Sequence, residues 1–134
     1  MTKHNDREST SATLEAQLKT IARKPFVLDV DGTLILADSE QWNEPQPLPG
    51  AAAFLASLRQ RGHPFLLLTN GTARPPDAYV ERLRAAGLDV RPGELLTPAA
   101  VAADLLASEY PGEPVFVLGD EGSRQPLAAR GIQL

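Results

Sequence analysis

Apolar residues in the first part of this chain follow two different spacings. Between positions 14 and 21 they recur at the i, i+4, i+7 interval that predicts a short amphipathic helix. Residues 26–30 form a nearly all-apolar run that ends in Asp-Gly, a pattern typical of a buried strand. We therefore expect a polar tail with a short helix over residues 1–24 and a folded core over residues 25–134.

The same alternation continues through the rest of the chain. Apolar runs at 64–68 and 115–118 predict two more buried strands, and Leu95-Leu96 predicts a shorter one. Apolar residues at helical spacing, with glycine, proline or Thr-Pro at their ends, predict helices between these strands. The expected helices lie near 50–61, 76–87, 98–110 and 126–130, with an irregular loop at 34–48 and the beginning of a strand at 131–134.

Strands that alternate with helices indicate a parallel sheet with right-handed crossovers. The predicted fold class is α/β, a Rossmann-like three-layer parallel sheet with helices on both faces. In such sheets ligands bind beyond the carboxyl ends of the strands. Candidate chemistry is therefore expected in residues 29–33, 69–72 and 119–121.

Composition narrows the possible partners. The 134 residues fit one domain, and 13 basic against 17 acidic side chains give a formal charge of −4. This charge argues against a nucleic-acid or anionic membrane surface, because both need clustered Lys and Arg. The chain has no cysteine, and no apolar run reaches the roughly 18 residues that span a bilayer. Because the N-terminus lacks the apolar stretch of a signal peptide, we expect a cytoplasmic protein.

The most informative polar residues follow the first predicted strand. Asp29 and Asp31 stand two positions apart, so both carboxylates leave the strand end in the same direction. Mg²⁺ relieves the repulsion of two such carboxylates and suits an all-oxygen site. Gly32 lets the backbone approach a ligand, and its N–H can face an anion. Asp29 could attack phosphorus while Asp31 protonates the leaving oxygen; the alternative is a turn with two solvated acids.

A second polar pair follows the strand at 64–68. The hydroxyl of Thr69, together with Asn70 and the backbone N–H groups nearby, can donate hydrogen bonds to a phosphate oxygen. Taken alone, these residues also fit an ordinary polar turn. Because Thr69 and Asn70 follow a second strand end, they and the pair Asp29 and Asp31 together favour a phosphate site more than either pair alone.

Several segments resemble one enzyme family. Residues 26–34, FVLDVDGTL, resemble motif I of the haloacid dehalogenase superfamily, and residues 67–70, LLTN, resemble its motif II. Three more segments resemble the NagD and p-nitrophenylphosphatase type, in which a large cap is inserted into the core. These segments are PGAA at 49–52, LTP at 96–98 and VLG at 117–119.

This resemblance implies a Mg²⁺-dependent phosphohydrolase that acts on a small phosphate ester through an aspartyl-phosphate. Asp29 would be the nucleophile and a metal ligand. Asp31 would be the general acid/base and would bind Mg²⁺ through its backbone carbonyl. Gly32, Thr69 and Asn70 would bind the phosphate of the substrate.

The chain also departs from the family pattern. Motif III of the family is a lysine, and this sequence has none after Lys24. Motif IV is a pair of acids at a strand end, for which Asp120 is the only candidate. Gly119-Asp120 instead resembles the turn that precedes the cap. The resemblance therefore implies the N-terminal part of the core without a cap.

Three other functions remain open from the sequence. The first is an inactive phosphate- or partner-binding module, whose exposed apolar sheet edge would favour a homodimer or a missing partner segment. The second is a compact capless phosphatase that uses Asp120 as a metal ligand. The third is a receiver-type phosphoacceptor domain, which also carries acids at strand ends but fits the DxDGT motif poorly.

Overall fold

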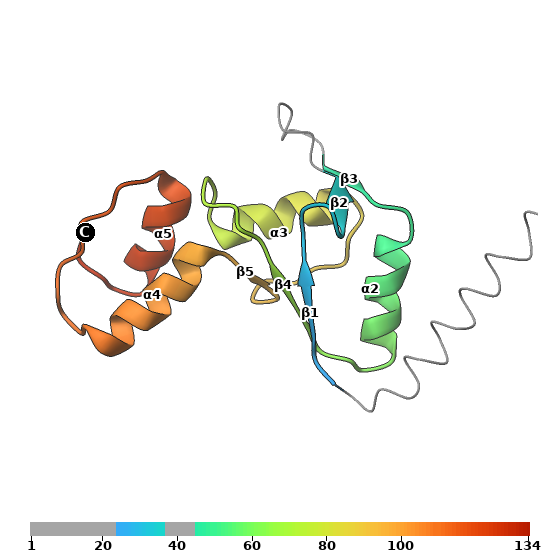
Figure 1. Cartoon of the computed structure of the whole chain (residues 1–134), viewed down its shortest axis with the longest axis horizontal. Coiled ribbons are helices and arrows are strands. Elements are labelled where there is room, and N and C mark those ends of the chain that lie inside the picture. The colour runs from blue at the N-terminus through green and yellow to red at the C-terminus, as the bar shows by residue number, and fades with distance from the viewer. Residues whose placement is uncertain (1–23, 37–44) are drawn as a thin grey trace, which may run out of the picture.

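The computed structural model describes residues 24–36 and 45–134 (Figure 1). The predicted N-terminal helix lies outside these residues. Within the described part of the chain, no helix combines the length and the apolar character that crossing a bilayer requires.

A three-stranded parallel sheet organises the described core. Its order is β1-β4-β5, with β1 at Phe26–Asp29, β4 at Phe65–Leu68 and β5 at Leu95–Leu96. Leu68 pairs with Asp29 on one side and with Leu96 on the other, so the carboxyl ends of the strands meet at one edge. The three predicted strands and the α/β class are confirmed.

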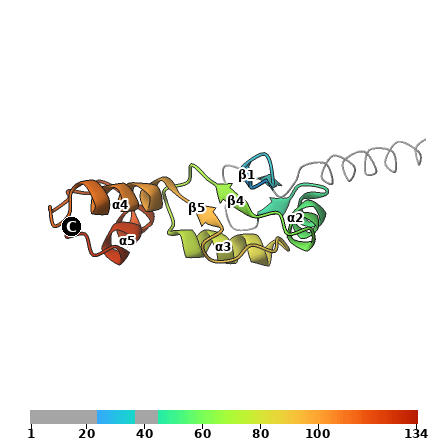
Figure 2. The ribbon, with the colours of Figure 1, turned by 90° about the horizontal axis from the view of Figure 1, so that it is seen from below.

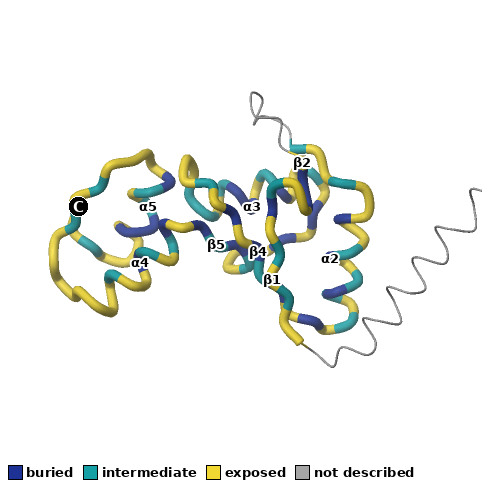
Figure 3. Tube along the Cα trace, viewed as in Figure 1, coloured by how far each residue is buried: buried dark blue, intermediate teal, exposed yellow. Residues whose placement is uncertain are grey.

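Two helices cover one face of this sheet, α2 at Ala51–Gln60 and α3 at Pro76–Ala85. Gly50, at φ 88°, turns the chain into α2, and Pro76 supplies the rigid first turn of α3. In Figure 3 buried residues gather between the strands and these helices. The side chains that form this core include Leu55, Leu58, Phe65, Leu67, Tyr79, Val80, Leu83, Leu88, Val90 and Leu95.

The opposite face of the sheet is far less covered. Side chains alternate along a strand, so Val27 and Leu68 point away from the core formed with α2 and α3. Val27 is 64% exposed and Leu68 is 40% exposed. α3 lies below the strands in Figure 2, whereas no described helix covers Val27 and Leu68 from the other side.

The segment after β1 contains a strand pair that the sequence does not predict. β2 (Ile35–Leu36) and β3 (Gln46–Pro47) form a two-stranded antiparallel pair, where an irregular loop was expected. Strands of two residues carry too few positions to show a period of two, which explains the difference. Ile35 is buried in the main core and anchors this pair to it.

A pair of helices lies to one side of the sheet, beyond β5 (Figure 1). Thr97 caps α4 (Pro98–Glu109) by accepting a 3.3 Å hydrogen bond from the N–H of Ala100, as Thr-Pro predicts. α5 (Glu121–Ala129) begins five residues before the predicted helix near 126–130. A small second core lies between the two helices and includes Ala99, Ala103, Leu127, Leu106, Val115, Val117 and Ile132.

The strands predicted at 115–118 and 131–134 are wrong. The two segments share the bond from the N–H of Val115 to the carbonyl of Gln133, at 2.8 Å, and no strand is present in either. Val117 packs inward, whereas Phe116 is 89% exposed and Leu118 is 87% exposed. Burial alternates along this apolar run as it does in a strand, but one backbone hydrogen bond between two segments does not make a strand pair.

Candidate active site

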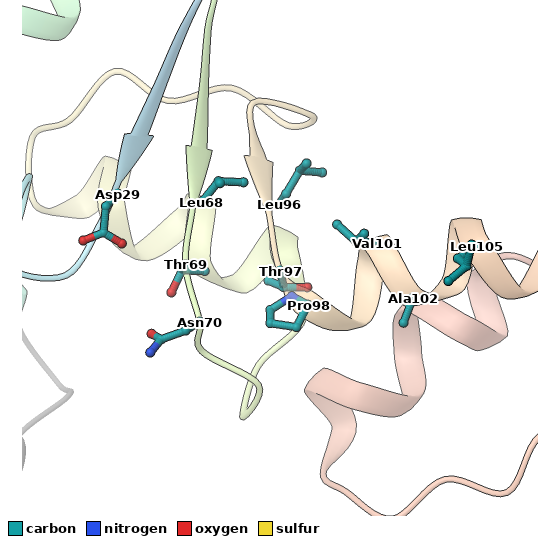
Figure 4. A pocket seen from close by; sticks show the side chains of 10 residues that line it. All are labelled: Asp29, Leu68, Thr69, Asn70, Leu96, Thr97, Pro98, Val101, Ala102 and Leu105. Carbon is teal, nitrogen blue, oxygen red and sulfur yellow. The ribbon is translucent and has the colours of Figure 1, made fainter.

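Polar residues from the first two strands of the sheet meet at the carboxyl edge. Asp29 ends β1, and Thr69 and Asn70 follow β4 directly (Figure 4). The pairing continues beyond the strands, because the N–H of Val30 donates to Leu68 and the N–H of Thr69 donates to Leu96. The structure therefore brings together the two predicted segments that carry Asp29, Asp31, Thr69 and Asn70.

A tight turn, fixed by backbone hydrogen bonds, sets the path of the chain after β1. The carbonyl of Val30 accepts hydrogen bonds from the N–H groups of Leu34, at 2.9 Å, and Ile35, at 3.1 Å. Gly32 adopts φ 78°, which favours glycine, and its N–H donates to the carbonyl of Ile35 at 2.8 Å. That N–H is therefore used within the turn and does not face an anion, contrary to the expectation from the sequence.

Each of the two carboxylates is positioned by a threonine. The hydroxyl of Thr33 donates to Oδ2 of Asp29, and the hydroxyl of Thr69 donates to Oδ2 of Asp31, both at 3.3 Å. Oδ1 of Asp31 is buried and has no hydrogen-bond partner among the described residues. The sequence motif contains Thr33, but reasoning from the sequence gave it no role.

Residues 69–74, which follow β4 and which we call the β4–α3 loop, are held by hydrogen bonds within the loop. Thr69 is 5% exposed, and its hydroxyl oxygen accepts a 3.1 Å hydrogen bond from the N–H of Gly71. Thr69 thus links the loop backbone to the carboxylate of Asp31. Asn70 is exposed at the same edge, where a ligand could reach it.

The charge of Asp31 affects the pKa of Tyr79, a buried phenol on α3. Burial raises the pKa of Tyr79 above its usual value, and the negative charge of Asp31 raises it further. The charge of Arg74 and a hydrogen bond from its backbone N–H act in the opposite direction. Tyr79 is therefore neutral at neutral pH and lies close to the two strand ends. Its helical spacing predicted burial, but nothing in the sequence indicated this position.

The carboxylates at this edge fit a partial magnesium site. Mg²⁺ in proteins binds one or two carboxylates and completes its shell with water and substrate phosphate. Asp29 would supply a carboxylate and Asp31 its backbone carbonyl, which leaves the unpartnered Oδ1 of Asp31 free to carry a proton. Among residues 24–36 and 45–134, no three His, Cys, Asp or Glu side chains gather as a ligand set. Asp120, which precedes α5, is therefore not clustered with this pair.

An apolar groove of about 630 Å³ begins beside these polar residues. Asp29, Thr69 and Asn70 border one end of it, and the rest runs along α4 (Figure 4). Val101 is 50% exposed and Leu105 is 57% exposed in this groove. Its other lining residues are Leu68, Leu96, Thr97, Pro98 and Ala102.

The arrangement agrees with a known protein family. Residues 26–133 match the family model described as haloacid dehalogenase-like hydrolase. The chain belongs to this family. The match confirms the resemblance inferred from residues 26–34 and 67–70, and it covers the sheet, the carboxylate pair and the two C-terminal helices.

Named relatives give the same result. The acid sugar phosphatase of Staphylococcus aureus is 31% identical over 109 residues, which cover 81% of this chain and 39% of that protein. The structure of 4-nitrophenylphosphatase from Thermotoga maritima superposes with a TM-score of 0.71 at 29% identity, covering 82% of this chain and 40% of that one. NagD from Escherichia coli gives a TM-score of 0.68 at 28% identity, with coverages of 84% and 41%. The chain thus spans about two fifths of the length of these relatives.

Proposed function

We propose that this chain carries the nucleophile and the acid/base of a Mg²⁺-dependent phosphohydrolase that acts on a small phosphate ester. The observation that carries the proposal is the hydrogen bond from Thr69 to Asp31, which joins the two strand ends into one site. Family membership and the phosphatase names of the relatives support the same reaction class. We further propose that the protein acts in the cytoplasm.

Asp29 is the nucleophile in this proposal. Thr33 holds its Oδ2, so we assign the attack to Oδ1, which forms a bond to phosphorus as the bond from phosphorus to the leaving oxygen breaks. The product of this step is an aspartyl-phosphate. A bound Mg²⁺ would neutralise charge on the carboxylates and on the phosphoryl oxygens.

Asp31 moves the protons in this proposal. Thr69 holds its Oδ2, and its unpartnered Oδ1 delivers a proton to the leaving oxygen during the first step. The same carboxylate then takes a proton from water, whose oxygen attacks phosphorus and releases Asp29. Asn70 orients the phosphoryl group, Thr69 supports its binding by holding Asp31 with its one hydroxyl hydrogen, and Gly32 shapes the turn beside it.

A second candidate function is a module that binds phosphate without turning it over. The chain has no lysine after Lys24, and the described acids form no cluster of three. Each missing electrostatic stabiliser of this kind typically lowers a rate by ~10²–10³-fold. The two functions share the same binding residues and differ in turnover.

Hydrolysis of p-nitrophenyl phosphate separates these functions. The chain is assayed with Mg²⁺ and with EDTA, beside Asp29→Asn and the control Asp77→Asn, which removes an exposed acid from the first turn of α3. We expect metal-dependent turnover that Asp29→Asn abolishes and Asp77→Asn retains. Phosphate binding without turnover would favour the binding module, and absence of both would refute the proposed site.

A further inference from the structure

We propose that Tyr79 is a positioning residue, whose phenol fixes the β4–α3 loop so that Thr69 stays aligned with Asp31. This inference rests on the proposed function, because it assigns a supporting role to a residue beside the proposed site. It adds a third element, α3, to a site built so far from the ends of β1 and β4.

The first support is the close approach of Tyr79 to Gly71. Tyr79 is 5% exposed and lies in the second turn of α3. A Cβ atom on Gly71 would lie 2.8 Å from Cζ of Tyr79 and closer still to the hydroxyl oxygen. The tip of the phenol therefore lies directly against the loop backbone, and only glycine leaves room for it.

Two hydrogen bonds connect this contact to the carboxylate of Asp31. The N–H of Gly71 donates to the hydroxyl oxygen of Thr69, and the hydroxyl of Thr69 donates to Asp31. A displacement of Gly71 therefore changes the direction in which the Thr69 hydroxyl points. Tyr79 acts on Asp31 through these two hydrogen bonds.

Tyr79 also contacts the far end of the same loop. Its phenol oxygen accepts a hydrogen bond from the backbone N–H of Arg74. One buried side chain thus contacts both Gly71 and Arg74 of this loop. A phenylalanine would keep the ring but lose this acceptor.

The loop is also supported by α5. Gly122 is buried in the first turn of α5, and a Cβ atom there would lie 2.6 Å from the carbonyl carbon of Ala73. The same atom would also clash with backbone atoms of Thr72 and Arg74. The β4–α3 loop therefore contacts both Tyr79 and the first turn of α5, which limits how far it can relax when one contact is removed.

The experiment compares Tyr79→Phe with Tyr110→Phe. The chain has two tyrosines, and Tyr110, at the end of α4, is 58% exposed, which makes it a matched control. Binding of inorganic phosphate with Mg²⁺ is followed by amide NMR, together with the resonances of the loop before phosphate is added. We expect Tyr79→Phe to weaken phosphate binding about fivefold, the factor that corresponds to one lost hydrogen bond. We also expect it to shift the Gly71 and Thr69 resonances, and Tyr110→Phe to do neither.

The outcomes separate this inference from the proposed function. Unchanged Gly71 and Thr69 resonances in a folded Tyr79→Phe protein would overturn the positioning role, whether or not phosphate binds. Shifted resonances in a chain that binds no phosphate would support the role of Tyr79 in the loop and refute the proposed function. Normal phosphate affinity in Tyr79→Phe would overturn the inference about Tyr79 and leave the proposed function standing.

A double-mutant cycle tests the contact itself. Gly71→Ala forces a methyl group against the phenol, and removal of the phenol oxygen by Tyr79→Phe takes away the nearest of the clashing atoms. The two losses in phosphate affinity should therefore sum to more than the loss of the double variant. Strictly additive losses would show that Gly71 and Tyr79 act independently and would contradict the inference.

Discussion

The hydroxyl of Thr69 donates a 3.3 Å hydrogen bond to Oδ2 of Asp31, and 38 residues of sequence separate the two. Thr69 is almost completely buried, so water cannot easily replace it as a donor. The same hydroxyl oxygen accepts from Gly71, which fixes its direction. This pair is the physical link between the two strand ends on which the proposed chemistry depends.

Thr69→Val should remove this link without leaving a void. A hydrogen bond to a charged group typically contributes about 1.5–3 kcal/mol, so we expect the free energy of unfolding to fall by about 2 kcal/mol. We expect turnover of p-nitrophenyl phosphate to fall by about 10²-fold, because Asp31 loses the donor that positions it. Thr69→Ser keeps the hydroxyl and should retain most of the stability and most of the turnover. Equal losses of stability and turnover in Thr69→Val and Thr69→Ser would show that the methyl group matters instead.

An ion pair on the opposite side of the core should make stability depend on pH. Arg59 of α2 donates to both carboxylate oxygens of Glu94 at 2.8 Å, and its guanidinium lies 4.9 Å from the ring centre of Phe65. The hydrogen bond from Arg59 is the main reason that the pKa of Glu94 is below its ordinary value of 4.5, with a further hydrogen bond from the N–H of Arg91.

The sign of this pH dependence follows from the lowered pKa. The folded state binds the proton of Glu94 less tightly than the unfolded state, so the stabilisation is fully present above about pH 4.5 and is lost as the pH falls through the folded pKa. Glu94→Gln should lower the free energy of unfolding at neutral pH by about 1 kcal/mol, because the pair is partly exposed. Urea unfolding at neutral and acid pH checks this. The difference from wild type should shrink in acid, and a difference that grows there would contradict the assignment.

The contact between α5 and the β4–α3 loop should be intolerant of even a methyl group. Gly122→Ala places a Cβ against three backbone groups, which cannot rotate away as a side chain could. Overpacking of this kind typically destabilises by about 1–3 kcal/mol. We expect a lower thermal unfolding temperature together with weaker phosphate binding. A stable Gly122→Ala protein with normal loop resonances would show that α5 does not support the loop.

The apolar groove should make the chain associate with itself. Contiguous exposed apolar surface beside an uncovered sheet face favours burial against another protein surface. Light scattering should give a mass that rises with protein concentration. The double substitution of Val101 and Leu105 by glutamate should lower that mass toward the monomer. A strict monomer at high concentration would contradict the predicted homodimer and leave a missing partner segment as the other expectation.

The sequence was sufficient for the sheet and for the site residues that lie at its edge. Strands β1 and β4 are short apolar runs next to glycine or proline, and parallel strands necessarily end at a common edge. This is why the sequence alone predicts that Asp29 and Thr69 lie close together. The turn at Gly32 was anticipated only in part, because the sequence predicted a glycine beside the ligand but neither its positive φ nor the use of its N–H within the turn.

Other features depend on contacts that no local pattern reveals. The apolar run at 115–118 predicts a strand, but among the described residues a single backbone hydrogen bond, from Val115 to Gln133, joins it to a neighbour. Helical spacing placed Tyr79 on the buried face of α3, but its contact with Gly71 is set by the path of the loop. Gly122 lies before the helix predicted near 126–130, and only the tertiary structure shows it in α5 against Ala73.

The most direct test of the account is to find the phosphoryl group on Asp29. The chain is mixed with p-nitrophenyl phosphate and Mg²⁺, quenched in acid during turnover, and its peptides are analysed by mass spectrometry. We expect one phosphoryl group on the peptide that contains Asp29, absent in EDTA and in Asp29→Asn. Turnover that persists in Asp29→Asn, or a phosphoryl group on another residue, would contradict the assignment of Asp29 as the nucleophile.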